Sequence, residues 1–314
     1  MEPMKQAWIF GLDGGGTGSR LRAESPEGTF LRAVEGGPLN PRSLGWEGAS
    51  AALSSLFGAL YAQSGLAPED CLAGCAGIAG VDRKDDTGIM KNLLHKAGGF
   101  GADVSLTVYN DSIPALAGAF GKIEGILLIA GTGSIAVGAN ASGRIVRSGG
   151  WGHVIGDEGS AWWVGREGIA AAARFHDRRG PQTSLLSRAL AFFKVREAFE
   201  LIPAVYEAFD KATIARFAIA VAEEREKGDE VSESIFRRAA DELALLATST
   251  ATRLGQAERE GEIAFAGGFL TNIPRLARDT EARILAALPR HRLVAPRADA
   301  VSGACLLARQ SLKM

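Results

Sequence analysis

Two apolar segments of this chain each lead directly into a loop rich in glycine and threonine, and this repetition constrains the fold most strongly. Residues 8–12 lead into DGGGT, and residues 125–130 lead into GTGS. In both halves two further strand-like segments follow the loop, at 20–25, 29–34, 135–139 and 144–147. The repeated order predicts a duplicated fold, on the evidence of element order rather than sequence identity between the halves.

The remainder of each half alternates helices and strands. In the first half the patterns predict helices over 44–63, 88–97 and 112–119 and strands over 72–78 and 104–108. In the second half they predict strands over 263–266 and 292–295 and helices over 272–288 and 298–309. A long helical section over 161–256 precedes these last elements. The order predicts the α/β class, with a helical insertion in the second half.

A chain of 314 residues exceeds the usual size of a single hydrophobic core, so two domains are expected. We place the first domain at 1–118, with the C-terminal helix 298–314 packing back on it. The second domain is expected at 119–297.

Composition excludes several classes of partner. The formal net charge of −1 leaves no broad basic field, which argues against nucleic acid. No apolar stretch is long enough to cross a bilayer and no signal peptide is apparent, so no membrane association is expected. The odd number of cysteines (Cys71, Cys75 and Cys305) fits a reducing cytoplasm rather than a disulfide framework. Cys71 and Cys75 are expected to be small buried side chains, because no second Cys or His pair completes a metal site.

The first glycine loop, with Gly14, Gly15, Gly16 and Thr17, has two interpretations. Glycine backbones can bring several N–H groups onto a phosphate, while Thr17 adds a hydroxyl and Asp13 a carboxylate for magnesium. A glycine-rich hairpin with an Asp-mediated turn explains the stretch equally well. The lysine of a Walker loop is absent, and no helix follows as in a dinucleotide-binding fingerprint.

The second loop favours the phosphate interpretation. Gly131, Thr132, Gly133 and Ser134 stand at the equivalent point of the second half. Two such loops at matching places in a duplicated fold could hold a polyphosphate between them, whereas two coincident hairpins are a weaker explanation.

Asp111, in the stretch VYNDS, comes just after one predicted strand and just before a helix. An aspartate in this place is most often a helix N-cap. It could instead be a general base at the carboxyl end of a strand, where open α/β sheets bind their ligands. A carboxylate fully used in capping would be a poor base.

The segment 149–168, GGWGHVIGDEGSAWWVGREG, combines aromatic rings, two adjacent acids and many glycines. A ring on a sugar face with carboxylates reaching its hydroxyls makes an effective polar pocket, so Trp151, Asp157 and Glu158 are interpreted as ligand-binding residues. Core packing is favoured for at least one of the Trp162–Trp163 pair, and a structural role for His153.

Two further loops stay open between structure and function. Gly267 and Gly268 follow a strand and precede a helix, where they could accommodate a flat ring or simply form a turn. Asn40, in the stretch GGPLN, could be a turn former or a hydrogen-bonding ligand.

The ordered motifs DGGGT, CAGIAGVDR, NDS, AGTGS, 149–168 and AGGF resemble the sugar kinase/Hsp70/actin superfamily. Within it the chain resembles the N-acetylglucosamine kinases of the BadF/BadG/BcrA/BcrD ATPase family over nearly its whole length. The segment 149–168 is the most specific part of the likeness, and DGGGT is the least specific.

This resemblance implies two ribonuclease-H-like (actin-like ATPase) domains with mixed five-stranded sheets flanked by helices, and ATP and sugar in the cleft between them. It implies Asp111 as the catalytic base and Asp13 as the residue that holds Mg²⁺ through water. The residues implied around the ATP phosphates are Gly14, Gly15, Gly16, Thr17, Gly131, Thr132, Gly133 and Ser134. Gly267 and Gly268 would lie by the adenosine. The residues implied around the sugar are Asn40, Asp111, Thr132, Trp151, Gly152 and Asp157.

The same family includes ATPases that activate a partner enzyme through a shared iron–sulfur cluster, held by cysteines of the second domain. The segment 119–296 contains no cysteine here, which favours the kinase branch.

We therefore expect ATP-dependent phosphorylation of a small amino sugar, N-acetylglucosamine to its 6-phosphate. The alternatives are a glucosamine kinase, an ATPase that activates a partner enzyme, and a non-catalytic sugar sensor. The helical insertion offers a surface for a homodimer.

Overall fold

The computed structural model describes residues 6–81, 83–207 and 209–312. Asp82, within the CAGIAGVDR motif, and residues 313–314 of the predicted last helix therefore lie outside the described residues. The chain divides into two units: Met1–Glu124 together with Pro296–Met314, and Gly125–Ala295. Each unit contains one five-stranded sheet and its own helices.

The sheet of the first unit contains β1 (Trp8–Gly14), β2 (Ser19–Glu24), β3 (Phe30–Gly36), β4 (Cys71–Ile78) and β5 (Ser105–Tyr109). Its strand order is β3-β2-β1-β4-β5. β1, β2 and β3 form an antiparallel meander, whereas β4 and β5 run parallel to β1. The carboxyl ends of β1, β4 and β5 therefore meet at one edge, which is where open α/β sheets bind ligands.

The sheet of the second unit contains β6 (Gly125–Ala130), β7 (Ser134–Ala139), β8 (Ile145–Gly149), β9 (Gly261–Ala266) and β10 (His291–Val294). Its order, β10-β9-β6-β7-β8, is that of the first sheet read from the other edge. The pairing is also the same, with β7 antiparallel to β6 and β8, and β9 parallel to β6 and β10. The predicted duplication and the mixed five-stranded sheets are thus confirmed.

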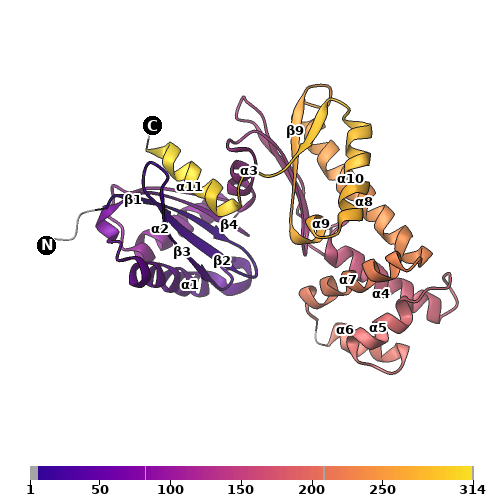
Figure 1. The fold of residues 1–314 in the computed structure, drawn as a ribbon. Helices are drawn as coiled ribbons and strands as arrows, with labels where there is room; N and C mark the ends of the chain where they lie inside the picture. The colour runs from indigo at the N-terminus through magenta and orange to yellow at the C-terminus, as the bar shows by residue number, and fades with distance from the viewer. Residues whose placement is uncertain (1–5, 82, 208, 313–314) are drawn as a thin grey trace. The chain divides into compact units, whose positions relative to one another are not determined.

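Helices cover both faces of the first sheet: α1 (Pro41–Ser64), α2 (Lys84–Gly98), α3 (Ser112–Phe120) and α11 (Ala300–Ser311), with a short 3₁₀ turn at Pro68–Asp70. The C-terminal helix α11 packs on β1, β4 and α3, and Figure 1 shows it in yellow against the indigo strands. Gly11 of β1 permits this approach, because a Cβ there would lie 2.4 Å from the carbonyl oxygen of Val301. On the other face, the rings of Phe10, Phe57 and Phe100 pack together in the core.

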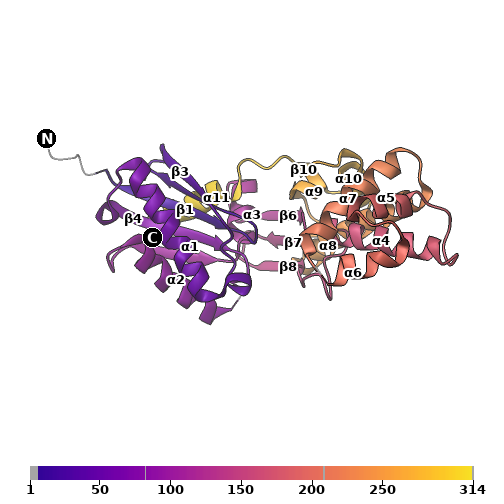
Figure 2. The same ribbon diagram turned by 90° about the horizontal axis from the view of Figure 1, so that it is seen from below.

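The helical section of the second unit contains α4 (Ala161–His176), α5 (Leu185–Phe193), a 3₁₀ turn (Ala198–Glu200), α6 (Leu201–Tyr206), α7 (Lys211–Glu226) and α8 (Glu230–Arg253). Helices α4 to α7 group together, while α8 also packs against β6, β7 and β8 (Figure 2). The short α9 (Gly268–Thr271) and α10 (Pro274–Ala287) complete the unit. Among the described residues, no helix is both long and apolar enough to cross a membrane.

Candidate functional site

The first glycine loop connects the antiparallel strands β1 and β2, so no helix begins there. The Gly15 amide donates to the Gly18 carbonyl (2.9 Å), which closes the loop on itself. Neighbouring backbone holds it from outside, since the amides of Leu39 and Ala79 donate to the carbonyls of Gly15 (3.0 Å) and Gly14 (2.8 Å). The carbonyl groups of Gly14, Gly15 and Gly18 thus all accept backbone hydrogen bonds, which stabilise the conformation of the loop.

The tip of this loop is left open. The Gly16 and Thr17 amides donate to no other group among the described residues. A Cβ added at Gly16 would meet nothing within 4 Å, so packing does not explain a glycine at this position. Consecutive unengaged amides in a glycine loop are the arrangement that binds an anion.

Asp13 is half-buried near the end of β1, opposite Arg20 of β2 in the strand register. Burial and the negative charge of Asp299 raise the pKa of the Asp13 carboxyl, and Arg20 only partly opposes them. Arg20 is shared with other acids, because its guanidinium also bonds Glu35 (2.7 Å) and Asp299 (3.2 Å). Asp13 therefore lies where an added cation would be favourable.

The cap of helix α3 comes from the residue before Asp111. The Asn110 Oδ1 accepts hydrogen bonds from the Ser112 amide (3.1 Å) and the Ser112 hydroxyl (2.7 Å). Asp111 already has helical torsion angles (φ −54°, ψ −27°), and its side chain makes no capping hydrogen bond. The interpretation of Asp111 as the capping side chain is therefore wrong, because Asn110 performs that role.

Asp111 also lies beside another strand end. A Cβ added at Gly77, near the end of β4, would lie 3.2 Å from the Asp111 Cα. The half-buried Asp111 and the first glycine loop thus belong to the same edge of the first sheet.

Asn40 caps helix α1, because its Oδ1 accepts a hydrogen bond from the Arg42 amide (2.8 Å). It packs closely on Gly80 (φ 79°), where a Cβ would lie 2.3 Å from this Oδ1. The structural interpretation of Asn40 is therefore correct for its carbonyl oxygen. Its amide nitrogen donates to no described group and is available to a ligand.

The second glycine loop, Gly131–Ser134, is held by a helix rather than by neighbouring loops. The Gly131 amide donates to the Gly133 carbonyl (2.9 Å). The first amides of α4, at Ala161 and Trp162, donate to the carbonyls of Gly131 (3.0 Å) and Thr132 (3.3 Å). In the described part of the chain the Thr132 and Gly133 amides donate to no other group, so this loop too presents a pair of open amides.

Asp157 braces this second loop. Its side chain is 5% exposed, and its backbone has a positive φ of 63°, which is uncommon for a residue with a Cβ. One carboxylate oxygen accepts from the Ser134 amide (3.2 Å), and the other pairs with the Lys211 ammonium (2.7 Å). Sequence analysis missed Lys211, because a lone lysine far along the chain forms no motif with Asp157.

The aromatic residues of 149–168 divide into exposed and buried groups. Trp151 is 64% exposed, and the Arg147 guanidinium lies 5.6 Å from its ring centroid. Trp162 and Trp163 are each 8% exposed, so core packing holds for both. His153 makes ring contacts with Trp162 and Phe209, which agrees with its expected structural role.

Gly267, which is predicted to lie by the adenosine, packs closely against the residue before the second glycine loop. Its φ is 86°, and a Cβ there would lie 2.4 Å from the carbonyl oxygen of Ala130, at the end of β6. A Cβ at Gly268 would meet only the side chain of Asn272, at 3.5 Å. Gly152, the remaining predicted sugar residue, has a φ of 81°.

All three cysteines are free and buried in the first unit, which confirms the interpretation of Cys71 and Cys75 as small core side chains. Burial raises the pKa of the Cys71 and Cys75 thiols to about 12, and that of Cys305 also rises. No group of three or more His, Cys, Asp or Glu suited to a metal ion occurs among the described residues.

Comparison with known proteins identifies the family of this chain. The model of the BadF/BadG/BcrA/BcrD ATPase family matches residues 10–308. The chain is 35% identical over 303 residues to the N-acetylmuramic acid/N-acetylglucosamine kinase of Clostridium acetobutylicum (96% of this chain, 98% of that protein). It is 29% identical over 323 residues to the N-acetyl-D-glucosamine kinase of Dictyostelium discoideum (99% and 100%).

A candidate N-acetylglucosamine kinase from Chromobacterium violaceum has a similar crystal structure. The TM-score is 0.77 at 28% identity, with 97% of this chain and 99% of that chain covered. The likeness extends over both units.

Proposed function

Because this chain belongs to the BadF/BadG/BcrA/BcrD ATPase family, we propose that it is an ATP-dependent kinase that phosphorylates N-acetylglucosamine at its primary hydroxyl, O6. The observation that carries this proposal is the pair of residues before α3. Asn110 caps the helix, so that Asp111 is not used as the cap. Asp111 is the general base in this proposal.

In the proposed reaction the Asp111 carboxylate accepts the proton of the O6 hydroxyl as that oxygen attacks the γ-phosphorus of ATP. The bond from this phosphorus to the β,γ-bridging oxygen breaks, and ADP leaves. The open amides of Gly16, Thr17, Thr132 and Gly133 stabilise the negative charge on the phosphate oxygens.

The donor set at the end of β1 fits magnesium. Mg²⁺ usually binds one or two carboxylates together with substrate phosphates and water. Asp13 is half-buried, and its pKa is raised by burial and by Asp299, so a cation would offset unfavourable negative charge. Asp13 would hold the ion through a bound water. When bound, Mg²⁺ supplies positive charge to the phosphate oxygens.

The proposed sugar contacts are Asn40, Asp111, Thr132, Trp151, Gly152 and Asp157, and Gly267 and Gly268 are proposed to lie by the adenosine. The amide nitrogen of Asn40 and the exposed ring of Trp151 support this proposal. Since the Clostridium relative is named for two acetylated amino sugars, N-acetylmuramic acid belongs in the substrate panel beside glucosamine.

The buried cysteines speak against an ATPase that shares an iron–sulfur cluster with a partner. Iron–sulfur clusters are held by accessible thiolates at a subunit interface in ATPases of that kind, whereas Cys71, Cys75 and Cys305 are all buried in the first unit. Buried free thiols also support a reducing, cytoplasmic location. For a homodimer, the exposed apolar side chains of Phe199, Ile202 and Tyr206 offer a surface on the helical insertion.

A coupled assay of ADP release over a panel of hexoses and amino sugars, with detection of the phosphosugar, tests the proposal. We expect the highest kcat/KM with N-acetylglucosamine. ATP hydrolysis that is independent of sugar, with no phosphosugar formed, would instead indicate an ATPase. Tight sugar binding without ATP turnover would indicate a sensor.

A further inference from the structure

The first residue of α7, Lys211, and the nearby Phe209 each contact the glycine-rich segment 149–168. The Lys211 ammonium pairs with the Asp157 carboxylate at 2.7 Å. Two residues earlier, the Phe209 ring stacks on His153, with centroids 5.7 Å apart and planes 24° apart. The helical insertion is therefore attached to the candidate site through an ion pair and an aromatic contact.

The ion pair is the stronger constraint, because it neutralises a buried charge. The Asp157 side chain is 5% exposed, whereas that of Lys211 is 31% exposed. A carboxylate this deeply buried is costly unless it is paired and hydrogen-bonded, so Asp157 depends on Lys211 more than Lys211 depends on Asp157.

Asp157 transmits this constraint to the second glycine loop. Its other carboxylate oxygen accepts the Ser134 amide at 3.2 Å. The Gly133 backbone lies directly against it, since a Cβ there would be 2.7 Å from the Asp157 Oδ1. A shift of the Asp157 carboxylate would therefore move the part of the loop that carries the open amides.

We propose that Lys211 is a positioning residue for phosphoryl transfer: through Asp157, it holds the loop Gly131–Ser134 in the conformation that binds the phosphates of ATP. The inference rests on the function proposed above and adds a residue that the sugar and phosphate sites do not include. It also gives the helical insertion a role at the site, because α7 begins with this lysine.

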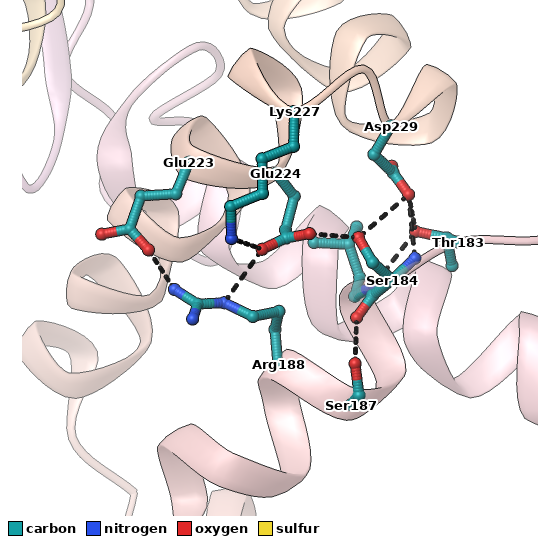
Figure 3. A network of polar contacts seen from close by, with 9 residues as sticks. Thr183, Ser184, Ser187, Arg188, Glu223, Glu224, Lys227 and Asp229 are labelled. Carbon is teal, nitrogen blue, oxygen red and sulfur yellow. Dashed lines mark hydrogen bonds and ion pairs between the residues drawn. The ribbon is translucent and has the colours of Figure 1, made fainter.

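The other end of α7 provides a matched control. There Lys227 pairs with the buried Glu224 at 2.8 Å, and Glu224 also accepts the Ser184 hydroxyl at 2.5 Å and pairs with Arg188 at 3.3 Å (Figure 3). The Glu224 side chain is 7% exposed, so this acid resembles Asp157 in burial and in its pairing with a lysine, although Lys227 is more exposed than Lys211. None of these partners belongs to the glycine loop.

The test compares Lys211→Met, Lys211→Arg and Lys227→Met with the wild type. We measure kcat, the KM values for ATP and sugar, and the rise in melting temperature caused by ADP. For Lys211→Met we expect kcat/KM for ATP to fall about tenfold or more, because small misplacements of binding groups are costly. The KM for sugar should also rise, because Asp157 and Thr132 are proposed sugar contacts, and the rise in melting temperature caused by ADP should shrink.

Lys211→Arg should recover most of the loss, since it restores the positive charge. Lys227→Met should lower the melting temperature while leaving kcat/KM and the ADP-induced rise near their wild-type values. Equal behaviour of Lys211→Met and Lys227→Met in both readouts would overturn the proposal. If Lys211→Met does not fold, Lys211→Gln replaces it, because its amide can still donate to Asp157 without charge.

The rise in melting temperature caused by ADP allows this inference to be tested independently of the proposed function. It requires nucleotide binding but no phosphorylated product. A wild type that responds to ADP but makes no phosphosugar would overturn the kinase proposal alone. A wild-type kinase with an unaltered ADP response in Lys211→Met would overturn the positioning role alone.

Discussion

Asp111 and Asp299 occupy equivalent places in the repeated element order, because Asp111 lies between β5 and α3 and Asp299 lies between β10 and α11. Both residues belong to the first unit, although β10 belongs to the second. Asp299 is a true N-cap: its backbone is extended (φ −79°, ψ 173°), and its side chain accepts the Ser302 amide at 3.0 Å. Asp111 has entered the helical conformation, and Asn110 supplies the cap in its place. The same residue type at the same point of the repeated element order thus caps a helix in one case and not in the other, because the residue before Asp111 is Asn110 and the residue before Asp299 is Ala298.

The two glycine loops differ in a parallel way. The first is held by backbone amides of its own unit's neighbouring loops, at Leu39 and Ala79, and carries the acid Asp13 at its entrance. The second is held by the start of α4 and by Asp157, and Ala130 stands where the first has its acid. In the second unit the inserted helices therefore take over the support that adjacent loops give in the first.

The largest expected effect is that of Asp111→Asn. Without the base, sugar phosphorylation should fall by on the order of 10² to 10⁴ in kcat, while ADP binding and the melting temperature stay close to wild type. The coupled assay measures kcat, and thermal unfolding with and without ADP measures the melting temperature and ADP binding. Wild-type turnover in this variant would remove Asp111 from the mechanism.

Most of the fold could be predicted because the strand-like segments end in recognisable turn residues. The repeated order of elements then indicated which segments of the two halves are equivalent. For the candidate site, the sequence predicted the two open glycine loops, because there residue type and position agree. Asn and Asp cap helices about equally well, so sequence alone could not assign the cap to Asn110 rather than Asp111. Lys211 lies 54 positions from Asp157 and meets it only through the packing of α4 against α7.

A methyl group on each glycine loop should separate ligand approach from internal packing. Gly16→Ala places its Cβ in open space, so the melting temperature should hold while the KM for ATP rises by roughly tenfold, as the methyl group obstructs phosphate. Gly133→Ala places its Cβ against Asp157 and should cost about 1–3 kcal/mol of stability. Thermal unfolding and ATP titrations of both variants give the comparison, and loss of stability in Gly16→Ala would contradict it.

Asp299→Ala tests whether Asp299, unlike Asp111, has a purely structural role as the cap of α11. Loss of the α11 cap should cost about 1 kcal/mol, with kcat changed far less than in Asp111→Asn. The melting temperature should fall by roughly 2–4 °C, and Asp299→Ser, which can still cap, should recover most of it. A loss of kcat comparable with that of Asp111→Asn would mean that the two aspartates share a catalytic role.

The smallest expected effect concerns pH and distinguishes the equivalent strands β5 and β10. β10 begins with His291, which is buried against Gly261 and has no hydrogen-bond partner on either ring nitrogen among the described residues. Burial lowers the pKa of this imidazole from its ordinary value of 6.5. As the pH falls below this value, the unfolded chain takes up a proton that the folded chain resists, so stability is lost.

His291→Leu removes this group from the proton balance. The difference in melting temperature between about pH 7.5 and about pH 5.5 should therefore become smaller than in the wild type. His176→Leu, at an exposed position of α4, should leave the difference unchanged. An unchanged pH dependence in His291→Leu would mean that acid sensitivity arises from groups elsewhere, and that β10 is no more sensitive to acid than β5, which begins with Ser105.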